Sequence, residues 1–184
     1  MLLEEIVDNS RTDKNTRHCY LPVYNNYFNY YKEKASNVLE VGIANGGSIR
    51  LWRDYFDNAT IYGVDMQKDA SEDLKNDGKI KLFLETNAYD ENFVKNNLSD
   101  VKFDIILDDG SHKLEDLKQV IKLYLPLLKD DGVLILEDLL YPQYGKDLEA
   151  VVPEELRKCC KEIDLRHVKG IYDSYLFIVD KRKI

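Results

Sequence analysis

The sequence has 184 residues and a formal net charge of −8, with 44% hydrophobic and 33% charged residues, a balance typical of one globular domain. No basic stripe is present to neutralise phosphates, which argues against a nucleic-acid partner. No apolar stretch approaches the ~18 residues of a membrane span. Glu4 and Glu5 stand where a secretion signal would carry positive charge, so we expect a cytoplasmic protein with no membrane partner.

Residues 1–36 precede the first predicted strand, and we expect them to form a short helical appendage. Four tyrosines recur there at helical spacing, namely Tyr20, Tyr24, Tyr27 and Tyr31. Such an aromatic face either docks a helix on the rim of the sheet or walls a ligand cleft. The sequence leaves both alternatives open.

Short apolar runs then alternate with amphipathic stretches, which predicts an α/β protein with a mostly parallel sheet. We expect strands at residues 38–41, 61–64, 80–84, 103–107, 133–136, 164–168 and 175–179. We expect helices at residues 48–56, 70–75, 91–98, 114–128 and 153–161, with a turn at 129–132. The prediction is therefore one domain over residues 1–184, a seven-stranded sheet with helices on both faces.

The loop after the first predicted strand has the composition of a ligand site. It reads Glu40-Val41-Gly42-Ile43-Ala44-Asn45-Gly46-Gly47-Ser48. Ala44 replaces the glycine that lets a pyrophosphate approach in dinucleotide folds. An acid before the loop suits a ligand with an amino group and a sulfonium, which indicates S-adenosylmethionine. Asp65, at the end of the second strand, is expected to accept hydrogen bonds from ribose hydroxyls, and Thr86 and Asn87 to meet the adenine.

Acidic residues end two further predicted strands, in Asp108-Asp109-Gly110-Ser111-His112 and in Glu137-Asp138. If these strands are neighbours, the carboxylates of Asp109, Glu137 and Asp138 converge beside the imidazole of His112. Such an oxygen-rich set with open positions favours magnesium over zinc. The alternative is that the acids only cap the helices that follow.

Together these motifs resemble one family, the metal-dependent sugar O-methyltransferases among the class I S-adenosylmethionine-dependent methyltransferases, typified by enzymes that methylate macrolide deoxysugars such as those of mycinamicin. The matching segments are Thr12-Asp13-Lys14 with His18 and Tyr20, the 39–48 loop, Leu51-Trp52, Tyr55-Phe56, Gly63-Val64-Asp65, residues 108–112 and residues 136–139. The resemblance implies a Rossmann-like fold. The macrolide enzymes carry a large additional N-terminal domain that these residues do not include.

The resemblance also implies roles for individual residues. It places Mg²⁺, with Mn²⁺ as an alternative, at Asp109, Glu137 and Asp138, and makes His112 the general base. The expected cofactor contacts are Thr12, Lys14, Glu40, Gly42, Gly46, Ser48, Asp65, Met66, Asn87 and Asp108.

The expected function is magnesium-dependent methyl transfer to a hydroxyl of a sugar or glycan. One alternative is a catechol-type metal-dependent O-methyltransferase, which takes vicinal phenols. Another is a non-catalytic subunit that only binds the cofactor. The sequence does not fix the sugar, the hydroxyl or the oligomeric state, for which a homodimer is one alternative.

Overall fold

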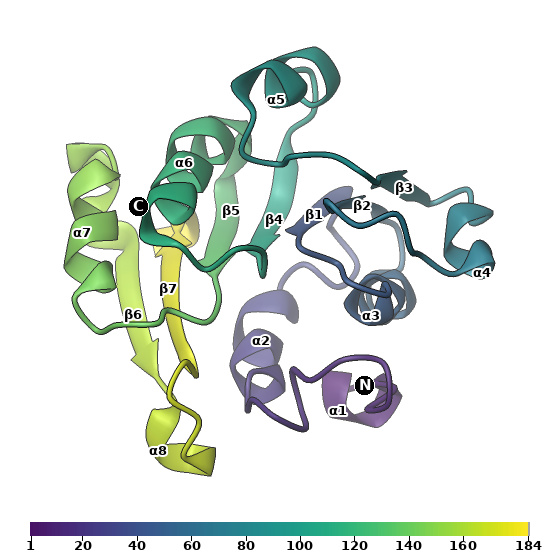
Figure 1. Ribbon diagram of the computed structural model, residues 1–184, viewed down its shortest axis with the longest axis horizontal. Coiled ribbons are helices and arrows are strands. Elements are labelled where there is room, and N and C mark those ends of the chain that lie inside the picture. The colour runs from purple at the N-terminus through teal and green to yellow at the C-terminus, as the bar shows by residue number, and fades with distance from the viewer. Residues whose placement is uncertain (184) are drawn as a thin grey trace.

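The sheet has seven strands in the order β3-β2-β1-β4-β5-β7-β6, and Figure 1 shows it running across the whole domain. The computed structural model describes residues 1–183. The strands are β1 (Asn37–Val41), β2 (Thr60–Val64), β3 (Ile80–Phe83), β4 (Phe103–Asp108), β5 (Leu128–Leu136), β6 (Cys160–Asp164) and β7 (Tyr175–Asp180).

Strands β1 to β5 pair in parallel, whereas β7 pairs antiparallel with both β5 and β6. The chain builds β1, β2 and β3 outward in one direction and then returns to place β4 on the other side of β1. In an open α/β sheet, this reversal leaves a crevice at the carboxyl ends of the two central strands. The fold therefore directs a ligand to the ends of β1 and β4.

Helices cover both faces of the sheet. They are α1 (Leu3–Ile6), α2 (Leu21–Phe28), α3 (Gly47–Tyr55), α4 (Glu72–Lys75), α5 (Glu91–Asn97), α6 (Leu114–Tyr124), α7 (Tyr144–Val151) and α8 (Arg166–Lys169), with 3-10 turns η1 (Leu125–Leu127), η2 (Glu154–Cys159) and η3 (Lys181–Lys183). In Figure 1, α1, α2 and α3 lie on one side of the sheet, and α5, α6 and α7 on the other. Within residues 1–183, every helix is too short or too polar to cross a membrane.

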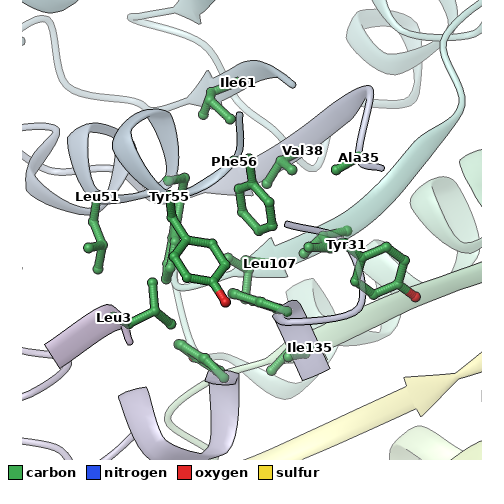
Figure 2. Packing of buried hydrophobic residues seen from close by; sticks show 14 of the residues in the cluster. Leu3, Tyr31, Ala35, Val38, Leu51, Tyr55, Phe56, Ile61, Leu107 and Ile135 are labelled. Carbon is green, nitrogen blue, oxygen red and sulfur yellow. The ribbon is translucent and has the colours of Figure 1, made fainter. Parts of the chain in front are cut away.

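Alternating strand residues feed two separate cores. Val38, Ile105 and Ile135 point into the first, together with α1, α2 and α3, and Figure 2 shows Leu3, Tyr55 and Leu107 among the side chains gathered there. The neighbouring residues Leu39 and Ile106 point into the second core, against α5, α6 and α7. This period of two is the geometry of a strand that is buried on both faces.

The N-terminal segment is part of the first core. Four tyrosines of the predicted aromatic face are buried, with exposed fractions of 0% for Tyr20 and Tyr24, 6% for Tyr27 and 1% for Tyr31. Tyr24 stacks on Phe28 and meets the edge of Trp52. Of the two alternatives for this helix, docking against the sheet is the one observed. The segment is thus an integral layer of the domain.

In the C-terminal third, the strand predicted at 175–179 was confirmed as β7, but several other expectations were wrong. The expected strand at 164–168 is β6 at Cys160–Asp164 followed by α8, and the expected helix at 153–161 is the 3-10 turn η2 running into β6. Helix α7 was missed. The expected turn at 129–132 lies inside β5, where the register with β4 shifts between Phe103 and Ile105. An edge strand with half-exposed residues carries little apolar periodicity, so tertiary pairing decided these elements.

Candidate active site

A cavity of about 680 Å³ opens at the carboxyl ends of β1, β2, β4 and β5. This is the size range of small-molecule sites. Its walls include Gly42 from the loop after β1, Asp65 after β2 and Asp109 after β4. Residues 9–13 and Thr16, from the loop between α1 and α2, close another side. The cavity occupies the topological switch point that the strand order creates.

Backbone packing requires glycine at two points of the cavity wall. A Cβ on Gly42, where φ is +79°, would lie 2.1 Å from the carbonyl oxygen of Asp109, and one on Gly47 would lie 2.0 Å from that of Arg11. Neither separation is possible for a real side chain. The glycine-rich loop therefore lets the β4 end and the N-terminal loop approach β1 closely.

Asp65 organises the loop that it faces. Its Oδ2 accepts hydrogen bonds from the backbone N–H groups of Ile43 and Ala44, both at 2.8 Å, and its Oδ1 accepts one from Gln67 at 2.7 Å. Ala44 adopts a φ of 45°, in the left-handed region. The Asp65 carboxylate still lines the cavity, so it holds the loop and faces the space where a ligand would bind.

Glu40 is fully buried beneath the same loop. Its Oε2 accepts hydrogen bonds from the hydroxyl of Ser48 at 2.6 Å and from the indole N–H of Trp52 at 3.0 Å. Its Oε1 lies 3.4 Å from the Nζ of Lys14. Burial raises the pKa of Glu40, and Lys14 opposes that rise. The Glu40 carboxylate therefore contacts Ser48, Trp52 and Lys14, and these partners were not predicted from the sequence.

Lys14 reaches from the N-terminal loop into the acids at the ends of β4 and β5. Its Nζ donates to Asp109 Oδ2 at 2.6 Å and to both oxygens of Glu137, at 2.9 and 2.7 Å. Lys14 and Glu137 are each 1% exposed. Burial alone would lower the pKa of Lys14, but Asp109, Glu137 and Glu40 hold it well above its ordinary value. The side chain is a buried ammonium surrounded by three carboxylates.

Asp109 also belongs to a second group, with His112 and Asp138. One candidate ligand atom from each of these side chains lies within 4.8 Å of the others, and His112 Nε2 is 3.8 Å from Asp109 Oδ1. His112 and Asp138 both adopt left-handed backbone conformations, with φ of 57° and 56°. Such strain in non-glycine residues is typical of functional sites.

Asp138 is oriented from the side away from the cavity. The hydroxyl of Tyr20 donates to its Oδ1, and His18 Nε2 lies 3.5 Å from its Oδ2. The ring of His18 stacks on Tyr20, and its Nδ1 lies 2.8 Å from the Ser174 hydroxyl. Burial and then the charge of Asp109 raise the pKa of Asp138. Tyr20 and His18 thus hold the Asp138 carboxylate beside the like charge of Asp109.

Asp108 is buried beside the cavity and contacts Tyr89. Tyr89 donates its hydroxyl hydrogen to Asp108 Oδ2 at 3.2 Å and accepts a hydrogen bond from the backbone N–H of Ser111 at 2.9 Å. Burial, with a smaller contribution from Asp109, raises the pKa of Asp108 to about 7. Tyr89 therefore links β4 to the loop that carries His112.

The structure places some of the predicted site residues on the cavity wall and others outside it. The predicted residues that line the cavity are Thr12, Gly42, Ser48, Asp65, Met66, Asp109, His112 and Asp138. Among the described residues, those that lie outside its lining are Lys14, Glu40, Gly46, Asn87, Asp108 and Glu137. Arg11 and Tyr89 line the cavity and were missed, because nothing in their local sequence marks them. Thr86, weighed with Asn87 for the adenine, does line it.

The donor set fits a hard divalent cation. The second group offers two carboxylates that open onto the cavity, and burial together with the like charge of Asp109 raises the pKa of Asp138. Magnesium prefers oxygen ligands and usually keeps several waters, so two carboxylates at an open cavity suffice.

Comparison with known proteins shows which family the chain belongs to. A model described as "Methyltransferase domain" matches residues 32–177. Demethylmacrocin O-methyltransferase of Streptomyces fradiae is 29% identical over 162 residues, covering 79% of this chain and 39% of that protein. Mycinamicin VI 2''-O-methyltransferase of Micromonospora griseorubida is 26% identical over 172 residues, covering 85% of this chain and 39% of that protein. The chain thus spans well under half the length of these relatives.

Solved structures share the fold. The MycE methyltransferase of the mycinamycin biosynthetic pathway, in complex with Mg, SAH and mycinamycin VI, superposes with a TM-score of 0.74 at 21% identity, over 98% of this chain and 53% of that one. A structure described as a putative caffeoyl-CoA O-methyltransferase from Staphylococcus aureus gives 0.59 at 18% identity, over 85% and 80%. Because the family model extends over most of the chain, the protein belongs to the methyltransferase domain family.

Proposed function

We propose that the protein transfers a methyl group from S-adenosylmethionine to a hydroxyl of a sugar or glycan, with a magnesium ion at the acidic end of the sheet and His112 as general base. The observation that carries this proposal is one cavity with two unlike ends. Asp65 and the glycine loop form one end, and Asp109, His112 and Asp138 form the other. The names of the relatives, which are O-methyltransferases of macrolide and tetracenomycin sugars, support the acceptor class.

The cofactor end has the properties that an adenosyl ligand requires. S-adenosylmethionine, when bound, supplies a methyl group on a positively charged sulfur. Asp65 lines the cavity, and its Oδ1 accepts one backbone hydrogen bond and keeps acceptor capacity for a ribose hydroxyl. The backbone N–H groups of Ile43 and Ala44 fix the orientation of the carboxylate through Oδ2.

The acidic end has the groups that an acceptor hydroxyl requires. Magnesium, when bound, supplies the charge that lowers the pKa of such a hydroxyl. The imidazole of His112 takes the hydroxyl proton, and Asp109, 3.8 Å away, stabilises the imidazolium that results. The acceptor oxygen forms its bond to the methyl carbon as the carbon–sulfur bond breaks, and the electron pair of that bond stays on sulfur.

Calorimetry tests the cofactor part. We expect S-adenosylhomocysteine to bind with micromolar affinity, about 8 kcal/mol, and Asp65→Ala to weaken it by about 1.5–3 kcal/mol, the scale of hydrogen bonds to a charged group. Asp69→Ala, an exposed acid four residues on, is the control and should leave binding unchanged. Binding of NAD in place of S-adenosylhomocysteine would contradict the assignment.

A mass-gain assay on a panel of acceptors tests the reaction and the acceptor class. The panel contains glycans, nucleotide sugars, deoxysugar glycosides and a catechol, each with magnesium or with EDTA. We expect methylation of a sugar, abolished by EDTA and by Asp109→Asn, and restored by magnesium or manganese better than by calcium. Methylation of the catechol alone would select the vicinal-phenol alternative. Cofactor binding with no acceptor methylated would select the non-catalytic alternative. Cytoplasmic location and oligomeric state stay predictions.

A further inference from the structure

The cavity wall carries one permanent positive charge among the described residues. Arg11 is the only lysine or arginine in the lining, whereas the lining includes the carboxylates of Asp13, Asp65, Asp109 and Asp138. The cofactor of the proposed function ends in an amino acid, whose α-carboxylate is an anion. Carboxylates repel such an anion unless a charged donor meets it. Arg11 is the side chain of this wall that stays positively charged at any ordinary pH.

Arg11 packs against the first turn of α3. A Cβ added to Gly47 would lie 2.0 Å from the carbonyl oxygen of Arg11 and 2.8 Å from its Cβ. Gly47 and Ser48 line the cavity, and among the described residues no side chain caps this end of the helix. Arg11 and the positive end of α3 thus share one part of the cavity wall, and both favour an anion.

The guanidinium of Arg11 is held in place without being neutralised. Its Nη2 donates to the hydroxyl of Ser71, the residue before α4, at 3.1 Å. Within residues 1–183 Arg11 forms no ion pair, and its charge reaches Asp8 only at a distance. The neutral hydroxyl occupies one donor and leaves other N–H groups of the guanidinium for a ligand. These N–H groups match the two oxygens of a carboxylate.

The glycine loop connects Arg11 to the acid expected at the ribose. Asp65 accepts hydrogen bonds from Ile43 and Ala44 at the start of the loop. Arg11 packs on Gly47 at the end of the same loop. All five residues line the cavity. A cofactor whose ribose meets Asp65, and whose amino-acid end follows the loop, therefore brings its carboxylate to Arg11.

We propose that Arg11 binds the α-carboxylate of S-adenosylmethionine beside the first N–H groups of α3, and so selects a cofactor that retains its whole amino-acid end. This inference rests on the proposed function, because it concerns the cofactor of that site. It gives the loop between α1 and α2 a role in cofactor recognition that is separate from the acids at the acceptor end.

Calorimetry with two ligands that differ in one group tests the inference without turnover and without added metal. The ligands are S-adenosylhomocysteine and its decarboxylated analogue, in which hydrogen replaces the α-carboxylate. We expect the unmodified protein to bind S-adenosylhomocysteine about ten- to a hundredfold more tightly, the range of hydrogen bonds to charged groups. Arg11→Met should weaken binding of S-adenosylhomocysteine at least about tenfold. It should change binding of the analogue less than about threefold.

Arg17→Met is the matched control. Arg17 belongs to the same loop, its side chain is 49% exposed, and its Nη2 lies 3.6 Å from Asp173. It is not part of the cavity lining, so its replacement should leave both affinities unchanged. Arg11→Lys keeps the charge and loses the planar fork, and it should retain part of the preference for S-adenosylhomocysteine.

A purely structural role for Arg11 would give a different pattern. If Arg11 only tied the loop to Ser71, Arg11→Met would weaken both ligands equally and Ser71→Ala would reproduce that loss. That result, or equal affinity of the unmodified protein for the two ligands, would overturn the inference and leave the cofactor assignment intact. Failure of the unmodified protein to bind either ligand would overturn the cofactor assignment itself, and this inference with it. Circular dichroism spectra check that each variant is folded.

Discussion

The two ends of strand β4 both carry buried aspartates, but their surroundings differ. At the amino end, Asp104 accepts hydrogen bonds from the backbone N–H groups of Ser36 and Asn37, at 2.8 and 3.0 Å, and from Lys129 at 2.8 Å. At the carboxyl end, buried Asp108 lies beside the charge of Asp109, and Asp109 also faces Glu40 of β1 and the Glu137-Asp138 pair after β5. Asp104 accepts hydrogen bonds on both of its oxygens, whereas the carboxylates at the carboxyl end carry more negative charge than the neighbouring cations neutralise.

The difference separates an acid that holds the fold from acids that perform chemistry. A buried carboxylate with several donors stabilises the elements that supply them. Carboxylates that face one another, with raised pKa values, cost stability and persist where a ligand compensates them. The strained backbone at His112 and Asp138 belongs to the same end. Four substitutions test this contrast.

The largest expected effect is on the rate. His112→Ala removes the proposed base and should lower methyl transfer by about 10²–10⁴, which is about 2.7–5.4 kcal/mol of transition-state stabilisation. The rate is measured at saturating cofactor, magnesium and an identified acceptor. His167→Ala, an exposed histidine on α8, is the matched control and should keep the full rate. Equal rates for His112→Ala and the unmodified enzyme would assign the base to another group.

The next largest effect is on stability, at the opposite end of β4. Asp104→Ala leaves two backbone N–H groups and the ammonium of Lys129 without their acceptor, so the free energy of unfolding should fall by about 2–3 kcal/mol. Urea denaturation measures this. Affinity for S-adenosylhomocysteine should not change, since Asp104 is at the far end of the strand. A loss below about 0.5 kcal/mol would remove the contrast between the two ends.

A smaller effect of the opposite sign is expected at the carboxyl end. Asp138→Asn removes one charge from the group, keeps an oxygen for the Tyr20 hydroxyl, and suits a positive φ that asparagine tolerates. Without divalent cation it should raise the free energy of unfolding by about 1 kcal/mol, the scale of a typical single substitution, because one of two facing like charges is removed. With magnesium added the order should reverse, because the unmodified protein binds the cation more tightly and therefore gains more from binding. Destabilisation in EDTA would count against surplus charge at this end.

The smallest effect is expected at an exposed pair remote from both ends. Arg166 donates to Asp164 at 2.6 Å, and this hydrogen bond lowers the pKa of Asp164 to about 2. Any stability from the pair is present above the ordinary pKa of 3.8 and lost as the pH falls toward 2. Because both side chains are more than a third exposed, solvent screens the pair, and Arg166→Ala should leave the melting temperature at pH 7 almost unchanged. Thermal melts at pH 7 and pH 2.5 check both statements.

The sequence predicted several fully buried strands well, including the antiparallel strand β7, and the exposed edge strand β6 poorly. Strands β1, β2, β4 and β7 lie within one residue of their predicted bounds, because fully buried strands require unbroken apolar runs. β6 has exposed and half-exposed residues in place of such a run. The position of β6 follows from its pairing with β7. This pairing is a contact between two segments, and the local sequence of neither segment specifies it.

The same distinction applies to the candidate site. The acids, the glycines and His112 are visible in the sequence because each follows an apolar run directly, and the carboxyl ends of parallel strands meet at one edge. Lys14 gives no such signal. Its ammonium crosses from a loop before α2 to the ends of β4 and β5, 95 and 123 residues further along the chain, and only the folded backbone brings them together.

The sequence by itself therefore determined which residue types lie at the ligand edge, since hydrophobic periodicity and turn chemistry are local. The tertiary structure decided which acid is paired with which cation. Glu137 and Asp138 are adjacent in sequence, yet one faces a buried ammonium and the other the cavity. Neighbouring residues at the end of a strand point in opposite directions, and the left-handed φ of Asp138 turns that residue further. The environments of Glu137 and Asp138 depend on the packing of distant segments. The fold therefore decides which groups each of the two residues contacts.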